Sequence, residues 1–401
     1  MDGHLAAFIA PRAKTKSLRI LYHHRVVSRD GQHVHIDEMI AALRGLGHYV
    51  EMASPAVPET ADPGETGAGF VALLKRALPA PVYEAIEIAY NLPAFARIVA
   101  VWRHCRPDAI YERYSLYLLA GIALAKLTRT KLLLEVNAPL AKERARFGGL
   151  GLAGVARRLE RFVWQQADAV LPVSEPLAAY LIEEGVDPAR VTVIPNAIDP
   201  ARYDGFDAET AKAAFGLSGR IVLGFSGFMR EWHGLDGLIE ALAMPGLPQA
   251  AHLLLIGDGP ARLALEAKVA SLGLQSRVTF AGHVAREDIG SAIAAFDVAL
   301  QPSAVAYASP LKLFEYMAAG KAIIAPDQPN IREALTDGDS ALLFEPNNRA
   351  AMATAILRLA SDADLRRRLG TAARRQIDER GFTWEANARR VAGIAQRLTT
   401  G

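Results

Sequence analysis

Short apolar runs alternate with longer segments of helical periodicity along almost the whole chain. This rhythm is typical of βαβ units, whose parallel strands are buried on both faces. Six strands are expected in the first half, at residues 18–22, 49–52, 109–111, 131–136, 169–173 and 191–194. Six more are expected in the second half, at residues 220–225, 252–256, 277–280, 298–301, 321–325 and 341–344. The pattern predicts an α/β protein with two parallel sheets.

The two series of strands indicate two domains, because 401 residues exceed what one hydrophobic core usually organises. The break at residues 197–205 follows one strand and precedes a new series, so it is the expected linker. We place the first domain at residues 1–198 and the second at 199–380. Residues 381–401 carry an amphipathic helix that can dock on either domain, including back on the first. Open parallel sheets bind ligands beyond the carboxyl ends of their strands, so a cleft between the domains is the expected site.

Composition excludes several classes of protein. Lys and Arg number 45 against 43 Asp and Glu, a balance that offers no basic footprint for nucleic acid. Cys105 is the single cysteine, which excludes an internal disulfide and favours a reducing compartment. Asp2 stands where a signal peptide needs basic residues, and the longest apolar run, 116–125, has half the length of a membrane span. We therefore expect a cytoplasmic protein. The Pro- and Gly-rich segment 54–69 is expected to form a surface loop.

The segment 302–320 carries the clearest sign of chemistry. Ser309 followed by Pro310 predicts a helix start, because Ser caps free amides and Pro suits the first helical position. Such a helix end after a strand is a phosphate site, and Lys312 adds a full charge to its first turn. Glu315 lies roughly on the same face, where a carboxylate can accept both hydroxyls of a ribose. A capped helix with an ordinary Lys–Glu pair is the alternative.

Weaker signals come from turns. The turn 224–234 contains Gly227 with Arg230 and His233, which can meet an anion, or it is an ordinary βα turn. Residues 257–260 form a similar glycine turn, and the loop around Arg25 and Gly31 precedes an expected helix. Asp337 and Asp339 flank a glycine, which favours a surface turn over a metal site. The four histidines between residues 23 and 35 lack metal-ligand spacing.

Taken together, these segments resemble glycosyltransferase family four, the retaining enzymes of GT-B architecture. The resemblance covers nearly the whole chain and rests on four stretches: "VLPVSEPLAAYL" at 170–181, "VTVIPNAIDPARY" at 191–203, "VTFAGHV" at 278–284 and "SPLKLFEYMAAGKAIIAP" at 309–326. It implies two Rossmann-like domains facing across a cleft, with the acceptor on the first and a nucleotide-sugar on the second. It also implies transfer with retained anomeric configuration and without a metal or other cofactor.

The resemblance assigns roles by position. Glu315 matches the second glutamate of the family's pair, which holds ribose, and the amides near Pro310 and Leu311 match those at the diphosphate. Gly31 matches the glycine that faces the donor phosphates from the first domain. His283 and Val284 stand where backbone groups meet the base.

Three positions depart from the family pattern. The first glutamate of the pair falls at Tyr307, which makes the donor sugar hard to infer. The usual basic pair falls at Phe228 and His233, which leaves Arg230 as a displaced substitute. Asn137 stands where many members place a histidine near the sugar. A subset of the family that reads "SPLKLFEYMA" also lacks the first glutamate, so Tyr307 alone does not indicate inactivity.

The resemblance predicts catalysis by positioning and by stabilisation of the departing diphosphate. We assign that stabilisation to Lys312, Arg230 and the helix amides, count Ser309 among the residues that bind the donor, and place Glu135 and Asn137 near the reacting carbon. The expected donor is a UDP- or GDP-hexose, and the acceptor is a glycan or a lipid-linked molecule of polysaccharide biosynthesis. A nucleotide-sugar epimerase and a decayed, non-catalytic binding protein are the rival functions.

Contact with a membrane surface is a further expectation. Basic residues gather around an apolar, glycine-containing stretch, at Lys142, Arg144, Arg146, Arg157, Arg158 and Arg161. Such segments favour an anionic leaflet, whereas the alternative is a solvated helix face.

Overall fold

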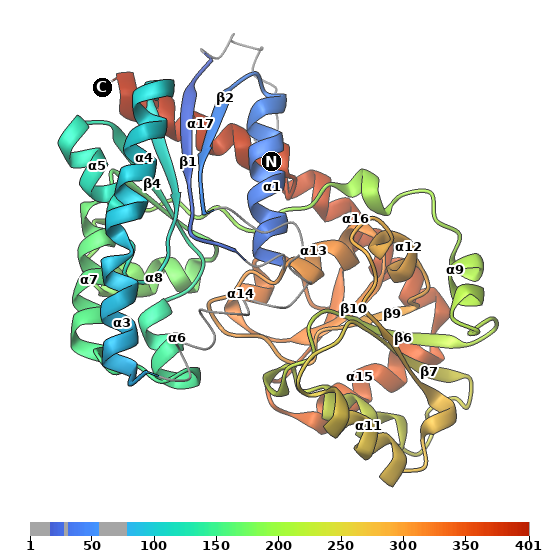
Figure 1. Cartoon of the computed structure of the whole chain (residues 1–401). Helices are drawn as coiled ribbons and strands as arrows, with labels where there is room; N and C mark the ends of the chain where they lie inside the picture. The colour runs from blue at the N-terminus through green and yellow to red at the C-terminus, as the bar shows by residue number, and fades with distance from the viewer. Residues whose placement is uncertain (1–16, 28–30, 56–77, 401) are drawn as a thin grey trace, which may run out of the picture.

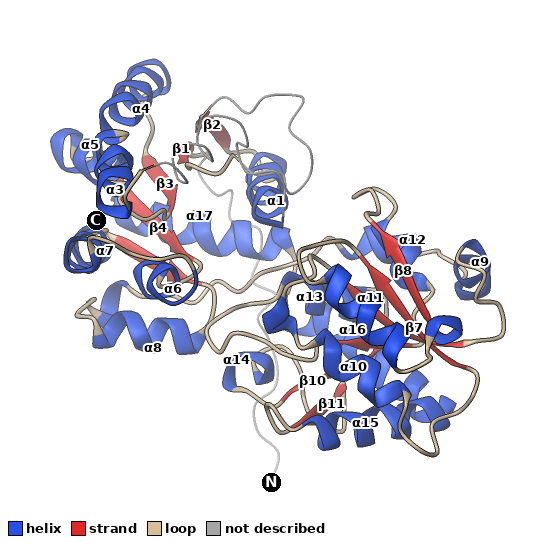
Figure 2. Ribbon diagram, turned by 60° about the horizontal axis from the view of Figure 1, so that its bottom comes forward, coloured by secondary structure: helices blue, strands red, loops and turns tan. Residues whose placement is uncertain are grey.

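Two parallel sheets, each covered by helices, build the molecule (Figures 1 and 2). The computed structural model describes residues 17–27, 31–55 and 78–400. The first sheet has the strand order β2-β1-β3-β4-β5, and the second has the order β11-β10-β9-β6-β7-β8. Every strand pair is parallel. The predicted α/β fold, with two Rossmann-like domains facing across a cleft, is confirmed.

The N-terminal domain contains the first sheet, whose strands are β1 (Arg19–His23), β2 (Tyr49–Ala53), β3 (Ala109–Arg113), β4 (Lys131–Val136) and β5 (Ala169–Pro172). Its helices are α1 (Gly31–Gly45), α3 (Ala80–Ala89), α4 (Asn91–Cys105), α5 (Ala120–Thr128), α6 (Leu140–Phe147), α7 (Ala153–Gln166), α8 (Glu175–Glu183) and the short η1 (Pro188–Arg190).

The C-terminal domain contains the second sheet, with strands β6 (Ile221–Ser226), β7 (Ala251–Ile256), β8 (Val278–Gly282), β9 (Val298–Leu300), β10 (Ala322–Pro326) and β11 (Ala341–Phe344). Its α-helices are α9 (Ala208–Ala214), α10 (Leu235–Leu242), α11 (Arg262–Ser271), α12 (Ile289–Ala294), α13 (Leu311–Ala318), α14 (Pro329–Arg332), α15 (Arg349–Ser361) and α16 (Ala363–Arg380). Short 3₁₀ turns are η2 (Pro200–Tyr203), η3 (Glu231–His233) and η4 (Gln275–Arg277). The last helix of the chain is α17 (Trp384–Thr400).

The strands follow the apolar runs of the sequence, and all expected strands but one are confirmed within two residues. The prediction of a strand at 191–194 is wrong. Thr192 and Ile194 each donate one backbone bond to β5, and only Val191 forms a bridge, before Pro195 and the linker lead the chain away. The expected loop at 54–69 lies outside the described residues from position 56 onward.

The chain crosses between the domains twice, and the two crossings touch. Ile198 in the first crossing donates its amide to Phe382 in the second at 3.1 Å and forms a bridge with Thr383. The helix α17 then packs beside α1 (Figure 1), and Trp384 and Val391 join the core around β1. The last helix of the chain therefore belongs to the packing of the N-terminal domain.

Helices α3 and α4 run almost end to end over Ala80–Cys105, and this stretch is long and apolar enough to cross a membrane by length and composition. The sequence analysis weighed only the run 116–125 and missed it. Ala94 and Ile98 of α4 pack into the core of the N-terminal domain, but only 11% of the most apolar window is buried.

Trp384 should be a major stabiliser of the N-terminal domain, because its side chain is 4% exposed in that domain's core. We expect Trp384→Ala to lower the free energy of unfolding by about 3–5 kcal/mol through lost burial and a cavity. The exposed Arg389 of the same helix offers a control, and Arg389→Ala should change the free energy of unfolding by less than about 0.5 kcal/mol. Urea denaturation measures both variants, and equal effects would show that α17 docks without stabilising the domain.

Candidate functional site

The strand order of each sheet marks where a ligand should bind. In the first sheet, successive strands are added on one side of β1 and then on the other, so the strand order reverses between β1 and β3. In the second sheet it reverses between β6 and β9. Ligands of open α/β sheets lie beyond the carboxyl ends of the strands at such switch points. Arg113 ends β3, Gly227 follows β6, and the loop after β9 leads into α13. The predicted cleft residues therefore lie where the topology opens both sheets.

The first turn of α13 has free amides, although Ser309 does not cap it as predicted. The helix begins at Leu311 with Pro310 at the N-cap position and no capping side chain. Instead, the Ser309 hydroxyl accepts from the backbone N–H of Asn196 at 3.1 Å, and its carbonyl accepts from the Asn196 side chain at 2.5 Å. Ser309 thus pairs with the residue just before the linker, and with Pro310 at the N-cap position the amino end of α13 keeps N–H donors for an anion.

Lys312 is a half-buried cation in this first turn. Its Nζ lies 4.0 Å from the centre of the Phe225 ring. A Cβ at Gly227, where φ is +136°, would lie 2.9 Å from the same Nζ, so the glycine makes room for the ammonium group. Burial lowers the pKa of Lys312 to about 8, and the nearby Glu315 opposes that shift.

Glu315 lies one turn further along α13. Burial raises the pKa of this carboxyl, while Lys312 and a hydrogen bond from the Tyr203 hydroxyl act in the opposite direction. Tyr203 comes from η2 in the linker. The carboxylate thus already accepts a hydroxyl group, which is the kind of donor that a ribose offers.

The turn after β6 places its two polar side chains differently. Burial and Lys312 lower the pKa of His233 to about 3, so this imidazole is neutral near pH 7. Arg230 is exposed, and its guanidinium stacks on the rings of Phe228 and Trp232 at 4.8 and 4.7 Å. His233 and Gly227 therefore lie close to Lys312. The role of Arg230 stays a prediction.

The other residues predicted to hold the donor lie on separate elements. His283 is exposed directly after β8, and Val284 packs against the core of the C-terminal domain. Gly31 is the first residue of α1. Gly257 follows β7, and a Cβ there would lie 2.1 Å from the Gly227 carbonyl oxygen. The second glycine turn therefore supports the first by direct backbone packing.

A buried polar cluster stands opposite, at the carboxyl end of the first sheet. The Glu135 carboxylate accepts from Arg113, from Asn137 at 2.6 Å, from Tyr111 at 2.7 Å and from His35 at 3.0 Å. His35 and Arg113 hold the pKa of Glu135 well below its usual range despite its burial. Because both carboxylate oxygens are fully used, Glu135 holds its neighbours in place and has no free position for a sugar. Its predicted place at the reacting carbon stays a prediction.

A cavity of about 210 Å³ lies between the two groups of residues. The N-terminal domain and the linker line it with Gln32, His35, Arg113, Asn137 and Asn196, and the C-terminal domain with Ser309 and Leu311. Sequence analysis missed His35, Arg113 and Asn196. Arg113 follows an expected strand end and Asn196 lies in a quoted motif, which were the signals available.

Tyr307 does not replace the missing glutamate in the cavity. Its hydroxyl donates to Glu143 of α6 at 2.5 Å, and its carbonyl accepts from the Ser174 hydroxyl at 2.7 Å. The ring packs on the core of the N-terminal domain. This position therefore joins the loop before α13 to the other domain.

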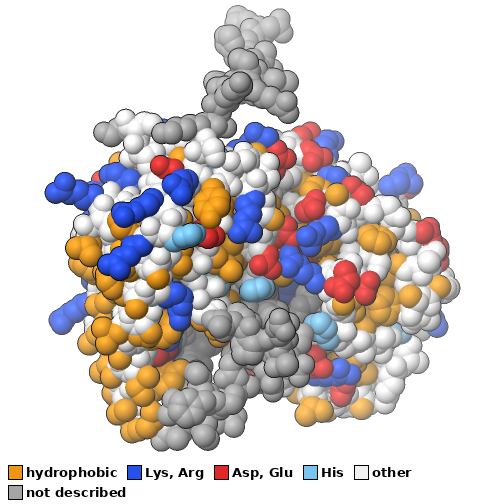
Figure 3. Space-filling model, turned by 45° about the horizontal axis from the view of Figure 1, so that its top comes forward, with side chains coloured by type: hydrophobic (Ala, Val, Ile, Leu, Met, Phe, Trp, Pro, Cys, Tyr) orange, Lys and Arg blue, Asp and Glu red, His pale blue; other side chains and the backbone are white. Residues whose placement is uncertain are grey.

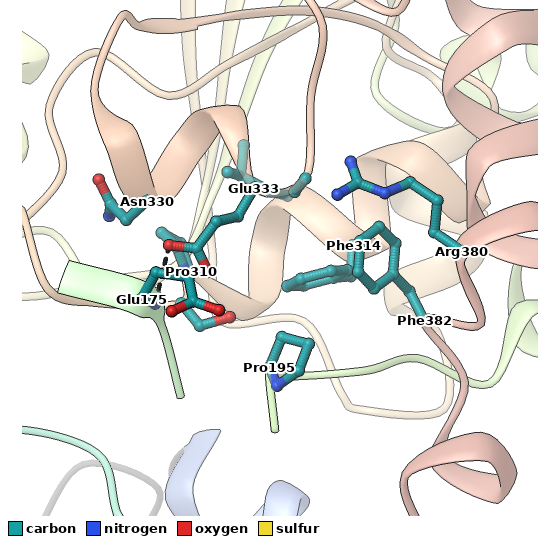
Figure 4. Close-up of a pocket in the computed structure, with 11 residues that line it drawn as sticks. Glu175, Pro195, Pro310, Phe314, Asn330, Glu333, Arg380 and Phe382 are labelled. Atoms are coloured by element: carbon teal, nitrogen blue, oxygen red, sulfur yellow. Dashed lines mark hydrogen bonds between the residues drawn. The ribbon is translucent and has the colours of Figure 1, made fainter. Parts of the chain in front are cut away.

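A second cavity, of about 250 Å³, is lined in part by Ser309 and Pro310 (Figure 4). The backbone N–H of Glu175 donates to Glu333 at 3.0 Å, and Arg380 and Phe382 complete the wall. Burial raises the pKa of Glu333 to about 7. This cavity adjoins the two domain crossings, and neither Lys312 nor Glu315 lines it.

Asp337 and Asp339 form a turn before β11, as expected. The Asp337 carboxylate accepts from the backbone of Leu343 at 2.8 Å, and both aspartates are exposed. Within residues 17–27, 31–55 and 78–400, no three His, Cys, Asp or Glu side chains are grouped to hold a metal ion.

Comparison with protein families identifies the two halves of the chain. Residues 29–202 match Glycosyltransferase Family 4, and residues 207–376 match Glycosyl transferases group 1. The chain belongs to the family-four glycosyltransferases.

Curated relatives of this family-four chain include the 2-deoxystreptamine glucosyltransferase of Streptomyces kanamyceticus, 30% identical over 51% of the chain and 54% of the relative. The D-inositol 3-phosphate glycosyltransferase of Nocardia farcinica is 29% identical over 57% of the chain and 52% of the relative. The matches thus span about half the length of these relatives.

Solved structures share the fold of the whole family-four chain. Anabaena Alr3699/HepE in complex with UDP-glucose has a TM-score of 0.74 at 20% identity, covering 96% of this chain and all of that one. Sucrose-phosphate synthase from Thermosynechococcus elongatus has the same TM-score and identity, covering 95% of this chain and 99% of that one.

The affinity of this family-four chain for a nucleoside diphosphate should fall as Lys312 loses its proton. Because the pKa of Lys312 is about 8, the charged form that attracts phosphate prevails below pH 8 and is lost above it. We expect binding to be about tenfold weaker at pH 9 than at pH 7 by titration calorimetry. Lys312→Met should bind more weakly at pH 7 and lose this dependence. An equal pH dependence in both proteins would remove Lys312 from the site.

Proposed function

We propose that this chain is a retaining glycosyltransferase that moves a hexose from a UDP- or GDP-sugar to a glycan or lipid-linked acceptor. The observation that carries the proposal is the amino end of α13, where the amides are uncapped, Lys312 and Glu315 lie one turn apart, and Leu311 lines a cavity between the domains. Family membership and the UDP-glucose held by the HepE neighbour support a nucleotide-sugar donor.

The nucleotide lies on the C-terminal domain in this proposal. Glu315 accepts the ribose hydroxyls. The backbone amides near Pro310 and Leu311 surround the diphosphate, although Pro310 itself has no N–H to donate. Backbone groups at His283 and Val284 meet the base, and Gly31 approaches the phosphates from α1. When the donor binds, the ribose hydroxyls replace the Tyr203 hydroxyl as hydrogen-bond donors to the Glu315 carboxylate.

Chemistry takes place where the donor sugar enters the cavity. The bond between the anomeric carbon and the β-phosphate oxygen breaks, and the acceptor oxygen bonds to that carbon on the same face. The acceptor proton passes to the departing phosphate oxygen. Lys312 and the α13 amides stabilise the charge on that phosphate, so the reaction proceeds without a metal ion.

The N-terminal domain positions the sugar and the acceptor. Asn137 lines the cavity and bonds the sugar with the polar atoms that Glu135 leaves free. Arg230 adds to phosphate stabilisation if its guanidinium leaves the exposed rings on which it stacks. A nearly neutral His233 contributes at most a hydrogen bond.

Incubation with radiolabelled UDP- and GDP-hexoses tests the function. We expect release of nucleoside diphosphate through transfer or slow hydrolysis, an α-linked product from an α-linked donor, and unchanged rates after exhaustive chelation.

Glu315→Gln should weaken nucleotide binding at least tenfold, because a charge-assisted bond contributes about 1.5–3 kcal/mol. An epimerised sugar would assign the rival enzyme class, and absence of turnover with every donor would leave a binding protein. Restoration of a chelated enzyme by Mg²⁺ would refute metal independence.

We further propose that the N-terminal domain rests on an anionic membrane surface on the cytoplasmic side. The outward side of α7 exposes Val155 and Phe162 beside Arg157 and Arg158. Helix α3 begins next to it, since a Cβ at Gly151 would lie 2.7 Å from Pro81, and it exposes further apolar side chains, at Val82 and Ile86. Figure 3 shows basic and hydrophobic side chains mixed over the outer side of this domain.

Not every basic residue of the predicted cluster belongs to this surface. Arg144 is half-buried and paired with Glu87, and Lys142 lies 4.9 Å from the Tyr180 ring. The two free arginines of α7 beside exposed aromatic and aliphatic side chains match the amphipathic pattern of interfacial helices. A lipid-linked acceptor would then lie close to the cleft.

Co-sedimentation with phosphatidylglycerol vesicles tests this contact. The double variant Arg157→Gln/Arg158→Gln should bind about thirtyfold more weakly, since each basic residue near such a surface contributes about 1 kcal/mol. The double variant Arg358→Gln/Arg375→Gln, exposed on the C-terminal domain, should bind normally. Equal binding of both variants, or equal binding to phosphatidylcholine vesicles, would show a solvated helix face.

A further inference from the structure

Arg113 is a buried cation with unused hydrogen-bond donors. It is the last residue of β3, is 5% exposed, and lines the cavity between the domains. Among the described residues its guanidinium bonds one partner, Glu135, through Nη1. A guanidinium carries five N–H donors, so most of those of Arg113 remain available to a ligand in the cavity that it lines. The geometry therefore calls for an anion in the cavity.

The surrounding cluster holds the carboxylate that partners Arg113. His35 directs Nδ1 to the Asn196 Oδ1 atom at 2.8 Å and Nε2 to Glu135 at 3.0 Å. The Asn196 amide is oriented by its Nδ2 group, which donates to the carbonyl of Ser309. These contacts fix Glu135, the one hydrogen-bond partner of Arg113 among the described residues, and leave the other guanidinium donors to a ligand.

The opposite wall of the cavity indicates which anion fits. Ser309 and Leu311 form that wall at the amino end of α13, and Glu315 lies one turn deeper in the C-terminal domain. With ribose on Glu315, the phosphates extend past the free amides toward the N-terminal domain. The phosphate farthest from the ribose arrives at Arg113.

We propose that Arg113 binds the β-phosphate of the nucleotide from the N-terminal domain, an assignment that rests on the proposed function. It supplies charge where the turn after β6 offers an apolar Phe228 and a neutral His233, and where Arg230 stacks on exposed rings. Glu135, His35 and Asn196 are positioning residues, because they hold Arg113 and tie it to α13 through Ser309. The nucleotide thereby contacts both domains at once.

Comparing a nucleoside diphosphate with its monophosphate isolates this contact. Calorimetry with UDP and UMP, or with GDP and GMP where the wild type binds these more tightly, measures the ratio of affinities. Arg113→Gln should weaken diphosphate binding about ten- to hundredfold and leave monophosphate binding unchanged. Arg113→Lys should recover part of the difference, because a point charge lacks the planar fork. Arg103→Gln, exposed on α4, should retain the wild-type ratio.

Each outcome decides between a contact and a structural role. Equal losses for both nucleotides in Arg113→Gln would mean that Arg113 only supports the fold near the site. An unchanged ratio in both Arg113 variants would overturn the contact while leaving the proposed function intact. Where Arg113→Gln does not fold, the ratio for Arg113→Lys decides alone, since that variant keeps the charge beside Glu135. Failure of the wild type to bind any of the four nucleotides would instead refute the proposed function.

Discussion

The two bonds between Asn196 and Ser309 hold the site together. Asn196 directly precedes the linker, and Ser309 precedes the helix whose amino end faces the cleft. Because Pro310, and not Ser309, occupies the N-cap position of α13, no side chain caps the helix and the amides of the first turn stay available to a ligand. Because the Asn196 side chain is fixed by the same contact, His35 and then Glu135 take defined positions in the other domain. One junction thus orients both walls of the cavity.

Charge in the cleft is distributed differently from the pattern that the family resemblance implies. The side chain of Lys312 on α13 lies against Gly227, in the turn that lacks the family's basic pair. Tyr307 stands at a position where the family usually has a carboxylate, and here it binds Glu143 across the domains. The position therefore lacks the family's carboxylate at the donor sugar and forms an interdomain contact instead.

The fold could be predicted because burial on both faces of a parallel sheet leaves long apolar runs in the sequence. The stretch 191–194 has the same apolar composition but does not form a strand. It makes only two backbone hydrogen bonds to β5 before the chain leaves the sheet. Local chemistry also identified Lys312 and Glu315, which lie one turn apart on one helix. It failed at Ser309, whose partner Asn196 is 113 positions away. His35, Arg113 and Glu135 come from three separate elements, so no local pattern could show that they meet.

A crystal structure of the chain with its preferred nucleoside diphosphate tests the central claim most directly. The account predicts ribose hydroxyls on Glu315 in place of the Tyr203 hydroxyl, and the diphosphate at the free amides of α13 beside Lys312. The terminal phosphate should face the cavity that Asn137 and Arg113 line. A nucleotide bound elsewhere, such as the cavity lined by Glu175 and Glu333, would contradict the account, as would a diphosphate held through a metal ion.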